Sequence, residues 1–416
     1  MSAGGKKSEN EGWERQINGL SNNEKANLLL EKHTFKELLA DVEQRNLQNN
    51  IVGLEASRLF ARSEINMGVD AFRDSLYAML KRNTFLNIKF ENMLDTLGEM
   101  SRTDLYSYLK EWEQLTPLPF YSIGEPELTK VVNKGGEEFF VLKVLVSNNS
   151  DYDGIIQMNV LQNGWWYQPM EDPRARKKVE IAAHTSKEFV SVWEEQIRDV
   201  EINTMVSGNL PYMIRQSIGN VKQERNKIVK DTIYTLPESS LEMPGEVIVD
   251  NEDSTLFVLS TPAVVGLLPK WLDKVEDTSF KYSGISWWRA PLQWTATTNA
   301  KYYGKYIRSA YVIKSGDGSQ TATWKIPVPE AGQYELYYHV FKDDELRWND
   351  RLQGEYHFRV AYDSEMEDAY INLRKANEGW EQLGTYYFSA DTVRVVLTDE
   401  CKLRSVTADA VKIVKR

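Results

Sequence analysis

The chain has 416 residues and a formal net charge of -11, because 61 aspartates and glutamates outnumber 50 lysines and arginines. This balance excludes a nucleic-acid partner, since neutralising phosphates needs a basic stripe and the cations here are scattered among a larger number of carboxylates. The single cysteine, Cys401, excludes an internal disulfide. The length predicts about two to four domains, and we take about three as the working count.

The sequence shows neither a membrane span nor a signal peptide. Its most apolar run, 255–268, is interrupted by Pro262 and is shorter than the roughly 20 residues that a bilayer requires. Residues 1–22 begin with M-S-A-G-G-K-K-S-E-N-E-G, which lacks the apolar core of a signal peptide, and they predict a disordered tail. Two explanations stay open: a cytoplasmic protein, or a fragment whose export signal or anchor lies upstream.

Residues 23–115 predict a helical region, because apolar residues recur at spacings of three and four and glycine and proline are rare. Asp70 and Asp104 suit first helical turns, and Asn87, Ser101 and Thr103 are candidate caps. Three amphipathic segments have the following apolar faces: Phe72, Leu76, Met79 and Leu80; Phe90, Met93, Leu94 and Leu97; Leu105, Tyr108, Leu109 and Trp112.

Part of this region, about 53–123, resembles a known enzyme family. It contains D-A-F-R-D-S-L-Y-A-M-L-K-R-N-T-F, then K-F-E-N-M-L-D-T-L-G-E-M-S-R-T-D-L-Y-S-Y-L-K-E-W, then P-L-P-F-Y-S-I. These motifs resemble the last helices of the catalytic domain in aminopeptidase-N-like gluzincin zinc peptidases, with weaker continuation to Pro211. The resemblance implies that the helices lead through a Trp-containing helix and a proline turn into a β-sandwich.

The chain lacks the residues of a gluzincin zinc site. Such a site needs two histidines four apart on a helix, a glutamate between them as general base, and a later carboxylate ligand. The four histidines, at positions 33, 184, 339 and 357, form no H-E-x-x-H. We therefore predict no metal, no cofactor and no catalytic residue in this chain, and we interpret Glu55 as a solvated or capping carboxylate.

Residues 116–215 change to the period of strands and predict a β-sandwich. F-F-V-L-K-V-L-V is a nearly continuous apolar run, I-I-Q-M-N-V follows it, and N-N-S-D-Y-D-G and Q-N-G supply turns. The resemblance implies that this domain packs and orients its neighbours. The next segment, 216–244, is dense in charge and bounded by prolines, which predicts a linker.

Residues 245–416 predict a second β-sandwich. Val393, Val395 and Leu397 alternate strictly with polar residues, as in a half-buried strand. Three motifs occur in order: E-V-I-V-D-N-E-D, A-T-W-K-I-P-V-P-E-A-G-Q-Y-E-L-Y-Y-H-V, and G-W-E-Q-L-G-T-Y-Y-F with T-A-D-A-V-K-I-V. This domain resembles the golvesin carboxy-terminal-like domain, a β-sandwich of bacterial envelope and secreted proteins. The resemblance implies an extracytoplasmic location (periplasmic, cell-surface or secreted) and favours the fragment explanation.

Two acidic clusters and a pair of histidines are weaker candidates. The row Asp250, Asn251, Glu252 and Asp253 offers oxygen ligands, but their spacing favours a turn over a cation site. A second cluster, Asp343, Asp344, Glu345, Asn349 and Asp350, has the character of an exposed loop, and no spacing selects Asp343 with Asp363 or Glu365 as a hydrolase pair. His339 and His357 fall on predicted neighbouring strands. We favour a pair that is hydrogen-bonded within the fold or exposed at the surface over a functional pair.

Aromatic residues give the best case for binding. Flat rings beside polar groups are surfaces on which sugars stack, and they also dominate protein contacts. The alternative is that the rings fill a core or a domain seam. We select Trp287, Trp288, Trp294 and Tyr303 as candidate ligand-binding residues, within a segment that also holds Tyr302, Tyr306, Arg289, Lys301 and Lys305. Because neighbours on a strand face opposite sides, one member of each pair, Trp287/Trp288 and Trp165/Trp166, should face outward.

The sequence thus predicts an α+β multidomain chain, a helical region followed by two antiparallel β-sandwich domains. Its predicted role is the non-catalytic accessory part of an envelope or secreted peptidase-like protein, whose last domain binds a glycan, a cell-wall polymer or a partner protein. The alternative is a zinc metallopeptidase whose H-E-x-x-H is supplied upstream or by another chain; a peptidase assay on this chain alone should be blank in either case.

Overall fold

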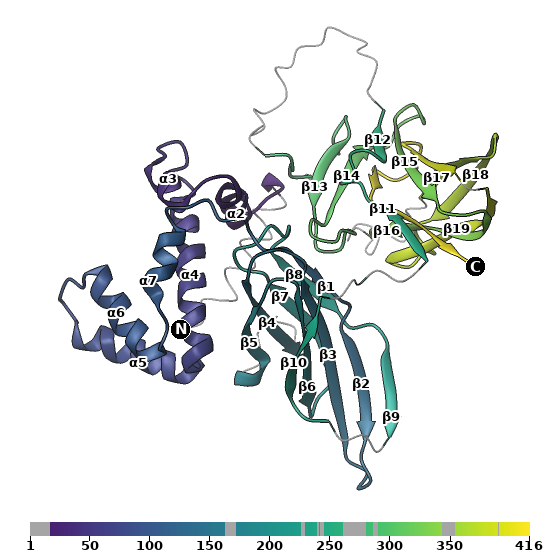
Figure 1. Cartoon of the computed structure of the whole chain (residues 1–416). Coiled ribbons are helices and arrows are strands. Elements are labelled where there is room, and N and C mark those ends of the chain that lie inside the picture. The colour runs from purple at the N-terminus through teal and green to yellow at the C-terminus, as the bar shows by residue number, and fades with distance from the viewer. Residues whose placement is uncertain are drawn as a thin grey trace. The chain divides into compact units, whose positions relative to one another are not determined.

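The computed structural model describes residues 17–162, 172–225, 229–238, 241, 245–260, 280–285, 290–342, 354–389 and 391–416 (Figure 1). These residues fall into two compact units, an N-terminal unit (22–241) and a C-terminal unit (17–21 with 245–416). The predicted fold class is confirmed, because a helical region is followed by two β-sandwiches whose described strand pairs are antiparallel except for β2 with β9. No helix among the described residues is long and apolar enough to cross a membrane.

The N-terminal unit begins with helices whose ends carry the expected local signals. Thr34 accepts a hydrogen bond from the backbone of Glu37, whose side chain bonds back to Thr34, and this capping box starts α3. Asp104 caps α7 by accepting from the backbone N–H groups of Tyr106 and Ser107. The helices are α2 (Asn22–Lys32), α3 (Phe35–Ala40), α4 (Gln48–Met67), α5 (Val69–Arg82), α6 (Phe90–Ser101) and α7 (Leu105–Glu111).

Two sheets form the sandwich of this unit. The larger has the order β10-β6-β3-β2-β9 with β1 also paired to β3, and the smaller has the order β5-β4-β7-β8. Apolar residues of β3 and β4, among them Leu142, Val144, Ile156 and Met158, share one buried core. The elements are β1 (Tyr121–Ile123), β2 (Glu127–Val132), β3 (Glu138–Asn148), β4 (Gly154–Gln162), η1 (Pro173–Ala175), β5 (Arg176–Ile181), β6 (Thr185–Trp193), β7 (Ile197–Asn203), β8 (Met213–Ser217), β9 (Val221–Arg225) and β10 (Thr232–Pro237).

The charged segment 216–244, for which the sequence predicts a linker, contributes strands to the larger sheet. β10 pairs antiparallel with β6, and β9 pairs parallel with β2. Both strands lie at sheet edges and leave most of their residues partly or fully exposed, which accounts for their polar composition.

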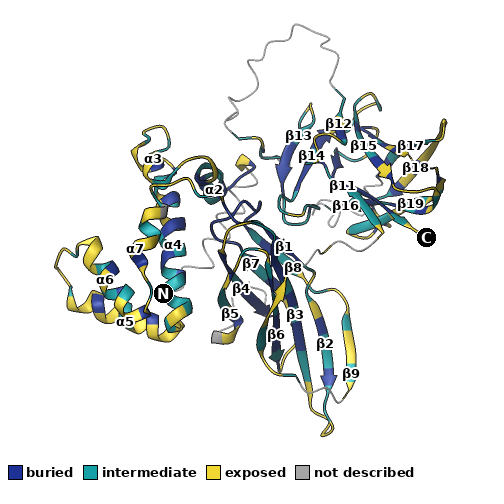
Figure 2. Ribbon diagram, in the orientation of Figure 1, coloured by how far each residue is buried: buried dark blue, intermediate teal, exposed yellow. Residues whose placement is uncertain are grey.

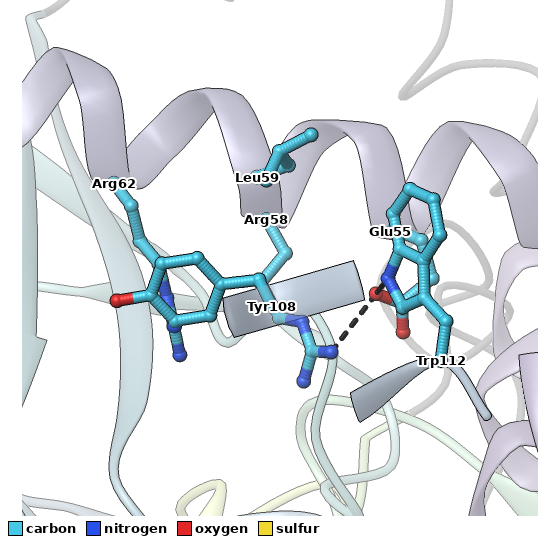
Figure 3. A pocket seen from close by; sticks show the side chains of 6 residues that line it. All are labelled: Glu55, Arg58, Leu59, Arg62, Tyr108 and Trp112. Carbon is cyan, nitrogen blue, oxygen red and sulfur yellow. Dashed lines mark hydrogen bonds and ion pairs between the residues drawn. The ribbon is translucent and has the colours of Figure 1, made fainter. Parts of the chain in front are cut away.

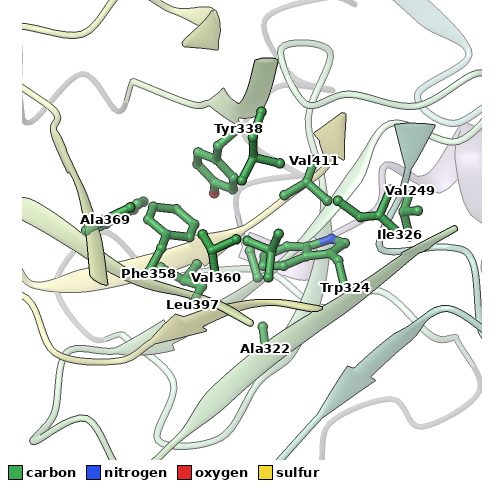
Figure 4. Close-up of a cluster of buried hydrophobic side chains, with 14 of the residues drawn as sticks. Val249, Ala322, Trp324, Ile326, Tyr338, Phe358, Val360, Ala369, Leu397 and Val411 are labelled. Atoms are coloured by element: carbon green, nitrogen blue, oxygen red, sulfur yellow. The ribbon is translucent and has the colours of Figure 1, made fainter. Parts of the chain in front are cut away.

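The C-terminal unit is a sandwich of a four-stranded sheet (β11-β22-β16-β19) and a five-stranded sheet (β12-β15-β20-β17-β18), with a three-stranded sheet (β13-β14-β21) beside them. Trp324 of β15, Tyr338 of β16 and Phe358 of β17 meet in its core (Figure 4). The strands are β11 (Glu246–Val249), β12 (Phe257–Leu259), β13 (Thr295–Thr298), β14 (Ser309–Lys314), β15 (Thr321–Val328), β16 (Gly332–Val340), β17 (Glu355–Tyr362), β18 (Glu365–Asn372), β19 (Gly379–Phe388), β20 (Asp391–Thr398), β21 (Ser405–Ala408) and β22 (Val411–Lys415).

Residues 17–21, the last part of the segment for which the sequence predicts a tail, pack within the C-terminal unit. The Thr298 hydroxyl donates a hydrogen bond of 3.0 Å to the carbonyl of Gly19. A side chain at Gly284 would place its Cβ 2.3 Å from the carbonyl oxygen of Ile17, so only glycine allows this approach.

Candidate binding face of the C-terminal sandwich

Strand β16 divides its side chains between the core and an outer face. Tyr334, Leu336, Tyr338 and Val340 are buried in the core. The residues between them, including Tyr337 and His339, point to the opposite side and are half-buried. The polar–apolar alternation of Y-E-L-Y-Y-H-V therefore creates a second, partly exposed surface on the four-stranded sheet, and Figure 2 shows intermediate burial along β11 and β19 of the same sheet.

Neighbouring strands place an aromatic ring and a cation beside these residues. His339 is the register partner of Trp380 on β19, and Tyr337 is the partner of Lys412 on β22. The Lys412 ammonium lies 4.8 Å from the centre of the Trp380 ring and 5.4 Å from that of Tyr337. Lys412 also forms a 2.7 Å ion pair with Glu246 of β11. Four strands, β11, β22, β16 and β19, thus contribute polar and aromatic groups to one face.

Tyr303 joins this group from the loop between β13 and β14. Its ring centre lies 5.0 Å from that of Trp380 and 5.8 Å from that of His339, and the rings of His339 and Trp380 lie 5.1 Å apart at nearly right angles. These are the offset and edge-on geometries that aromatic groups prefer. We call Tyr303, Tyr337, His339, Trp380 and Lys412 the aromatic platform.

A buried carboxylate, Asp409, fixes two members of the platform. Its oxygens accept hydrogen bonds from the backbone N–H of Tyr303, at 3.1 and 3.2 Å, and lie 2.9 Å from Nδ1 of His339. Burial raises the pKa of Asp409 above its ordinary value, while the neighbouring His339 opposes that shift. Because Asp409 has no exposed surface, it positions Tyr303 and His339 but does not itself face solvent.

The geometry also orients the His339 ring. Nδ1 donates its hydrogen to the carboxylate of Asp409, which leaves Nε2 as the second functional atom of the ring. Nε2 has no hydrogen-bond partner among the residues that the structure describes. The platform therefore combines ring surfaces with a polar atom able to engage a hydroxyl or a similar group.

Gly304 sets the path of the loop that carries Tyr303. Its φ is +155°, and a Cβ at this position would lie 1.9 Å from the carbonyl oxygen of Ile307. Around it, Asn299 accepts from the backbone N–H of Lys301 at 3.0 Å, and Arg308 donates to the carbonyl of Ala300 at 2.8 Å. The loop is thus closed by its own hydrogen bonds, with glycine at its tightest point.

The four candidate residues chosen from the sequence are placed differently. Tyr303 belongs to the platform. Trp294, half-buried, packs against the hydrophobic core, and its buried Nε1–H has no hydrogen-bond partner within the described ranges. Trp287 and Trp288 lie outside the described residues, as do Trp165 and Trp166.

Sequence reasoning missed Trp380, His339, Tyr337 and Lys412 as platform residues. The available signal was the alternation on β16, which separates Tyr337 and His339 from the core residues between them. Trp380 had no such signal, since it reaches this face through its pairing with His339.

Comparison with known proteins identifies part of the chain. Residues 288–415 match the golvesin C-terminal domain. No curated protein gives a significant match. The matched segment contains every member of the platform, and nothing in these comparisons supports the resemblance of the helical region to gluzincin peptidases.

The solved structures with detectable similarity are distant. "CBM35 from Cellvibrio japonicus Abf62" is 12% identical, with a TM-score of 0.19, and the match covers 27% of this chain and 75% of that one. For Bacteroides uniformis beta-glucuronidase the identity is 12%, the TM-score is 0.21, and the coverage is 76% and 32%. This chain thus spans about a third of the glucuronidase. At these TM-scores the likeness carries no argument about function.

Glu55, expected to be solvated or to cap a helix, is instead buried in the N-terminal unit and only 4% exposed. One of its oxygens accepts from the indole N–H of Trp112 at 3.0 Å and lies 3.0 Å from the Arg58 guanidinium (Figure 3). One turn further along α4, Arg62 lies over the ring of Tyr108. The cavity among these side chains is about 10 Å³, room for a single water, so Glu55 holds helices together.

The remaining candidates are held by local contacts. His339 and His357 do not face each other, because they lie on different sheets and on the faces that point away from the shared core. The His357 ring forms hydrogen bonds with Asp368 and Glu400, which agrees with the expectation that its ring nitrogens are bonded within the fold. Asp250 and Asp253 form the expected turn after β11, and no described group of three acidic, histidine or cysteine residues suits a metal ion. The cluster at 343–350 lies outside the described residues.

Proposed function

We propose that the C-terminal unit is a non-catalytic glycan-binding module and that the aromatic platform is its binding surface. The observation that carries the proposal is the convergence of Tyr303, His339 and Trp380, with ring centres 5.0 to 5.8 Å apart, on one partly exposed sheet face. The C–H face of a sugar ring is apolar and flat, and aromatic rings offer it a large contact area at a small cost in conformational entropy.

The polar groups around the rings suit the hydroxyls of a sugar. In the neutral ring of His339, Nε2 is a hydrogen-bond acceptor when Nδ1 donates to Asp409. Lys412, which is only 8% exposed, pairs with Glu246 at 2.7 Å and lies close to the rings of Trp380 and Tyr337. A few fixed polar groups around apolar contact surface are typical of sites that orient small ligands.

The platform supports binding more than catalysis. Glycoside hydrolysis uses two carboxyl groups that flank the scissile bond. Two carboxylates of this face are already engaged, Glu335 by the Tyr337 hydroxyl at 2.6 Å and Glu246 by Lys412 at 2.7 Å. Asp409 is fully buried and is engaged by Tyr303 and His339. A group in this position fixes its neighbours and has no access to a substrate.

We further propose that the glycan is part of an extracellular or envelope polymer and that the protein works outside the cytoplasm. The match of residues 288–415 to the golvesin C-terminal domain supports this location, because the resemblance implies a module of bacterial envelope and secreted proteins. The same module would then serve a longer parent protein by attaching it to its polymer.

A binding assay with the full chain tests this proposal. Cellulose, xylan, chitin and peptidoglycan are incubated separately with the wild type, and any polymer that retains it is tested with Trp380→Ala and Tyr303→Ala. Each variant should bind at least about tenfold more weakly, as truncation of a central aromatic anchor does. Tyr387→Ala is the matched control, because Tyr387 is an exposed aromatic residue of the same strand, β19, outside the platform.

Two outcomes contradict the proposal. One is retention of the wild type by none of the four polymers. The other is equal retention of the wild type, Trp380→Ala and Tyr303→Ala while all three show the same thermal unfolding. Trp287→Ala and Trp288→Ala, included in the same series, test the two sequence-predicted residues that lie outside the described ranges.

A further inference from the structure

A second surface, in the N-terminal unit, concentrates exposed apolar side chains at one turn. It spans 77–90, from the end of α5 to the first residue of α6. Phe85 is fully exposed and Leu86 is 65% exposed, and Figure 2 shows exposed residues along α5 and α6 at this end of the unit. The exposed apolar residues of this surface, which we call the α5–α6 tip, are Tyr77, Leu80, Phe85, Leu86 and Phe90.

The turn itself is ordered by hydrogen bonds. The Asn83 side chain donates to the carbonyl of Met79 at 2.8 Å, and the Thr84 hydroxyl donates to that of Lys81 at 2.8 Å. The backbone N–H of Leu86 donates to the carbonyl of Asn83 at 2.9 Å. Phe85 has a φ of +66°, a left-handed conformation that is strained for a large side chain. The fold thus holds an unfavourable phenylalanine conformation that points the ring into solvent.

The charge of the tip is opposite to that of the chain. Lys81, Arg82 and Lys89 are exposed, and the sequence from Ser75 to Phe90 contains no aspartate or glutamate, although the net charge of the protein is -11. None of the three cations has an ion-pair partner among the described residues, whereas Arg73, earlier on α5, pairs with Asp70 and Asp74. The tip is therefore a cationic, apolar patch on an acidic protein.

We propose that the α5–α6 tip docks on an anionic lipid bilayer. Phe85 and Leu86 would enter the interface between headgroups and acyl chains, and Lys81, Arg82 and Lys89 would contact lipid phosphates, which is the arrangement of peripheral membrane anchors. The complementary charge selects this occupant. A second copy of the same tip would bring three cations against three others, and a neutral apolar partner would leave the cations without counter-charges.

Vesicle sedimentation with the full chain tests the inference. The protein is mixed with vesicles of phosphatidylcholine alone, or of phosphatidylcholine and phosphatidylglycerol at about 7:3, in low salt and in about 0.5 M NaCl. We expect binding to the anionic vesicles in low salt, weakened by the higher salt. Each cation should contribute about fivefold to the partition coefficient.

Paired variants separate the two parts of the surface. Phe85→Ser with Leu86→Ser should reduce binding by about tenfold or more, and charge reversal at Lys81, Arg82 and Lys89 by about 100-fold or more. The control is Leu292→Ser with Lys134→Glu, an exposed apolar residue and an exposed cation outside the tip. Hydrogen–deuterium exchange of 77–90 should slow on anionic vesicles. Absent binding, equal binding to both vesicle types, unchanged binding of the tip variants, or no protection of 77–90 would overturn the proposal.

Discussion

Asp409 and His339, 70 positions apart in the chain, are joined by a 2.9 Å contact between a fully buried carboxylate and a ring nitrogen. The Asp409 carboxylate also accepts a hydrogen bond from the backbone N–H of Tyr303. The backbone carbonyl of Asp409 accepts one from the indole N–H of Trp324 at 3.2 Å. One residue therefore connects the hydrophobic core to two members of the aromatic platform. This connection explains how a loop and the four-stranded sheet present their groups in one arrangement.

We predict that Asp409→Asn destabilises the C-terminal unit by about 1–3 kcal/mol, because an amide has only one acceptor oxygen where two N–H donors now meet the carboxylate. Glycan binding should fall together with stability, since His339 and Tyr303 lose their common anchor. Thermal unfolding followed by circular dichroism measures the first effect. Asp391→Asn, at an exposed position at the start of β20, should leave both unchanged. An unshifted unfolding temperature for Asp409→Asn would contradict the anchoring role.

Gly304→Ala should distort the loop that carries Tyr303. The new methyl group would sit 1.9 Å from the Ile307 carbonyl oxygen, so the backbone must move, and we expect a loss of about 1–3 kcal/mol. Gly53→Ala provides a control of opposite sign. Gly53 lies inside α4 with no atom within 4 Å of the position that a Cβ would take, and alanine there should stabilise by about 0.5–1 kcal/mol. Unfolding temperatures that move in the same direction for the two variants would refute this reasoning.

Local patterns in the sequence predicted most of the buried faces, although Leu80 and Phe90, placed on the predicted apolar faces of their helices, are exposed. The alternation of Val393, Val395 and Leu397 is matched by their burial in the core, and Leu94 and Leu97 are fully buried on α6. Helix ends were less predictable. Asn87 does not cap α6, which begins after Lys89 without a side-chain cap, whereas Asp104 rather than Ser101 or Thr103 caps α7. Several polar residues in succession offer competing caps, and tertiary packing selects among them.

Contacts between distant segments could not be predicted. His339 and His357 lie on strands that follow one another among the described elements, yet β16 and β17 join different sheets, because β16 pairs with β19 and β22. The platform depends on that topology, since Trp380 meets His339 only through it. Composition identified an aromatic-rich segment, but it gave no means of separating Trp294, which packs on the core, from Tyr303, which reaches the outer face.

The Glu55 network in the helical region should behave as a structural ion pair. Glu55→Leu leaves the Arg58 guanidinium and the Trp112 indole N–H without their carboxylate, and removal of one partner of a buried pair costs about 3–5 kcal/mol. Trp112→Phe, which removes one hydrogen bond and part of the ring, is the milder comparison. Zinc added to the wild type should leave the unfolding temperature unchanged, because no described set of ligands accompanies Glu55. A zinc-dependent increase would restore Glu55 as a metal-ligand candidate.

His184 predicts a pH dependence in the N-terminal unit. It lies between β5 and β6, with Nε2 2.8 Å from Asp151 and Nδ1 2.7 Å from Glu238, and these hydrogen bonds, that of Asp151 first, raise the pKa of the ring. A raised pKa means that the folded protein holds the proton more strongly than the unfolded chain. The stabilisation is therefore complete below the unfolded value of about 6.5 and is lost as the pH rises through the folded value.

His184→Asn tests this dependence, since asparagine tolerates the left-handed φ of +51° at this position. The variant should unfold at a lower temperature than the wild type at pH 5.5, and the difference should shrink as the pH rises through the pKa of the folded ring. Asp151→Asn removes the strongest cause of the shift, so it should lower the pKa of His184 in an NMR titration while leaving the ring in place. A difference between wild type and His184→Asn that grows with pH would show that the two carboxylates do not stabilise the protonated ring.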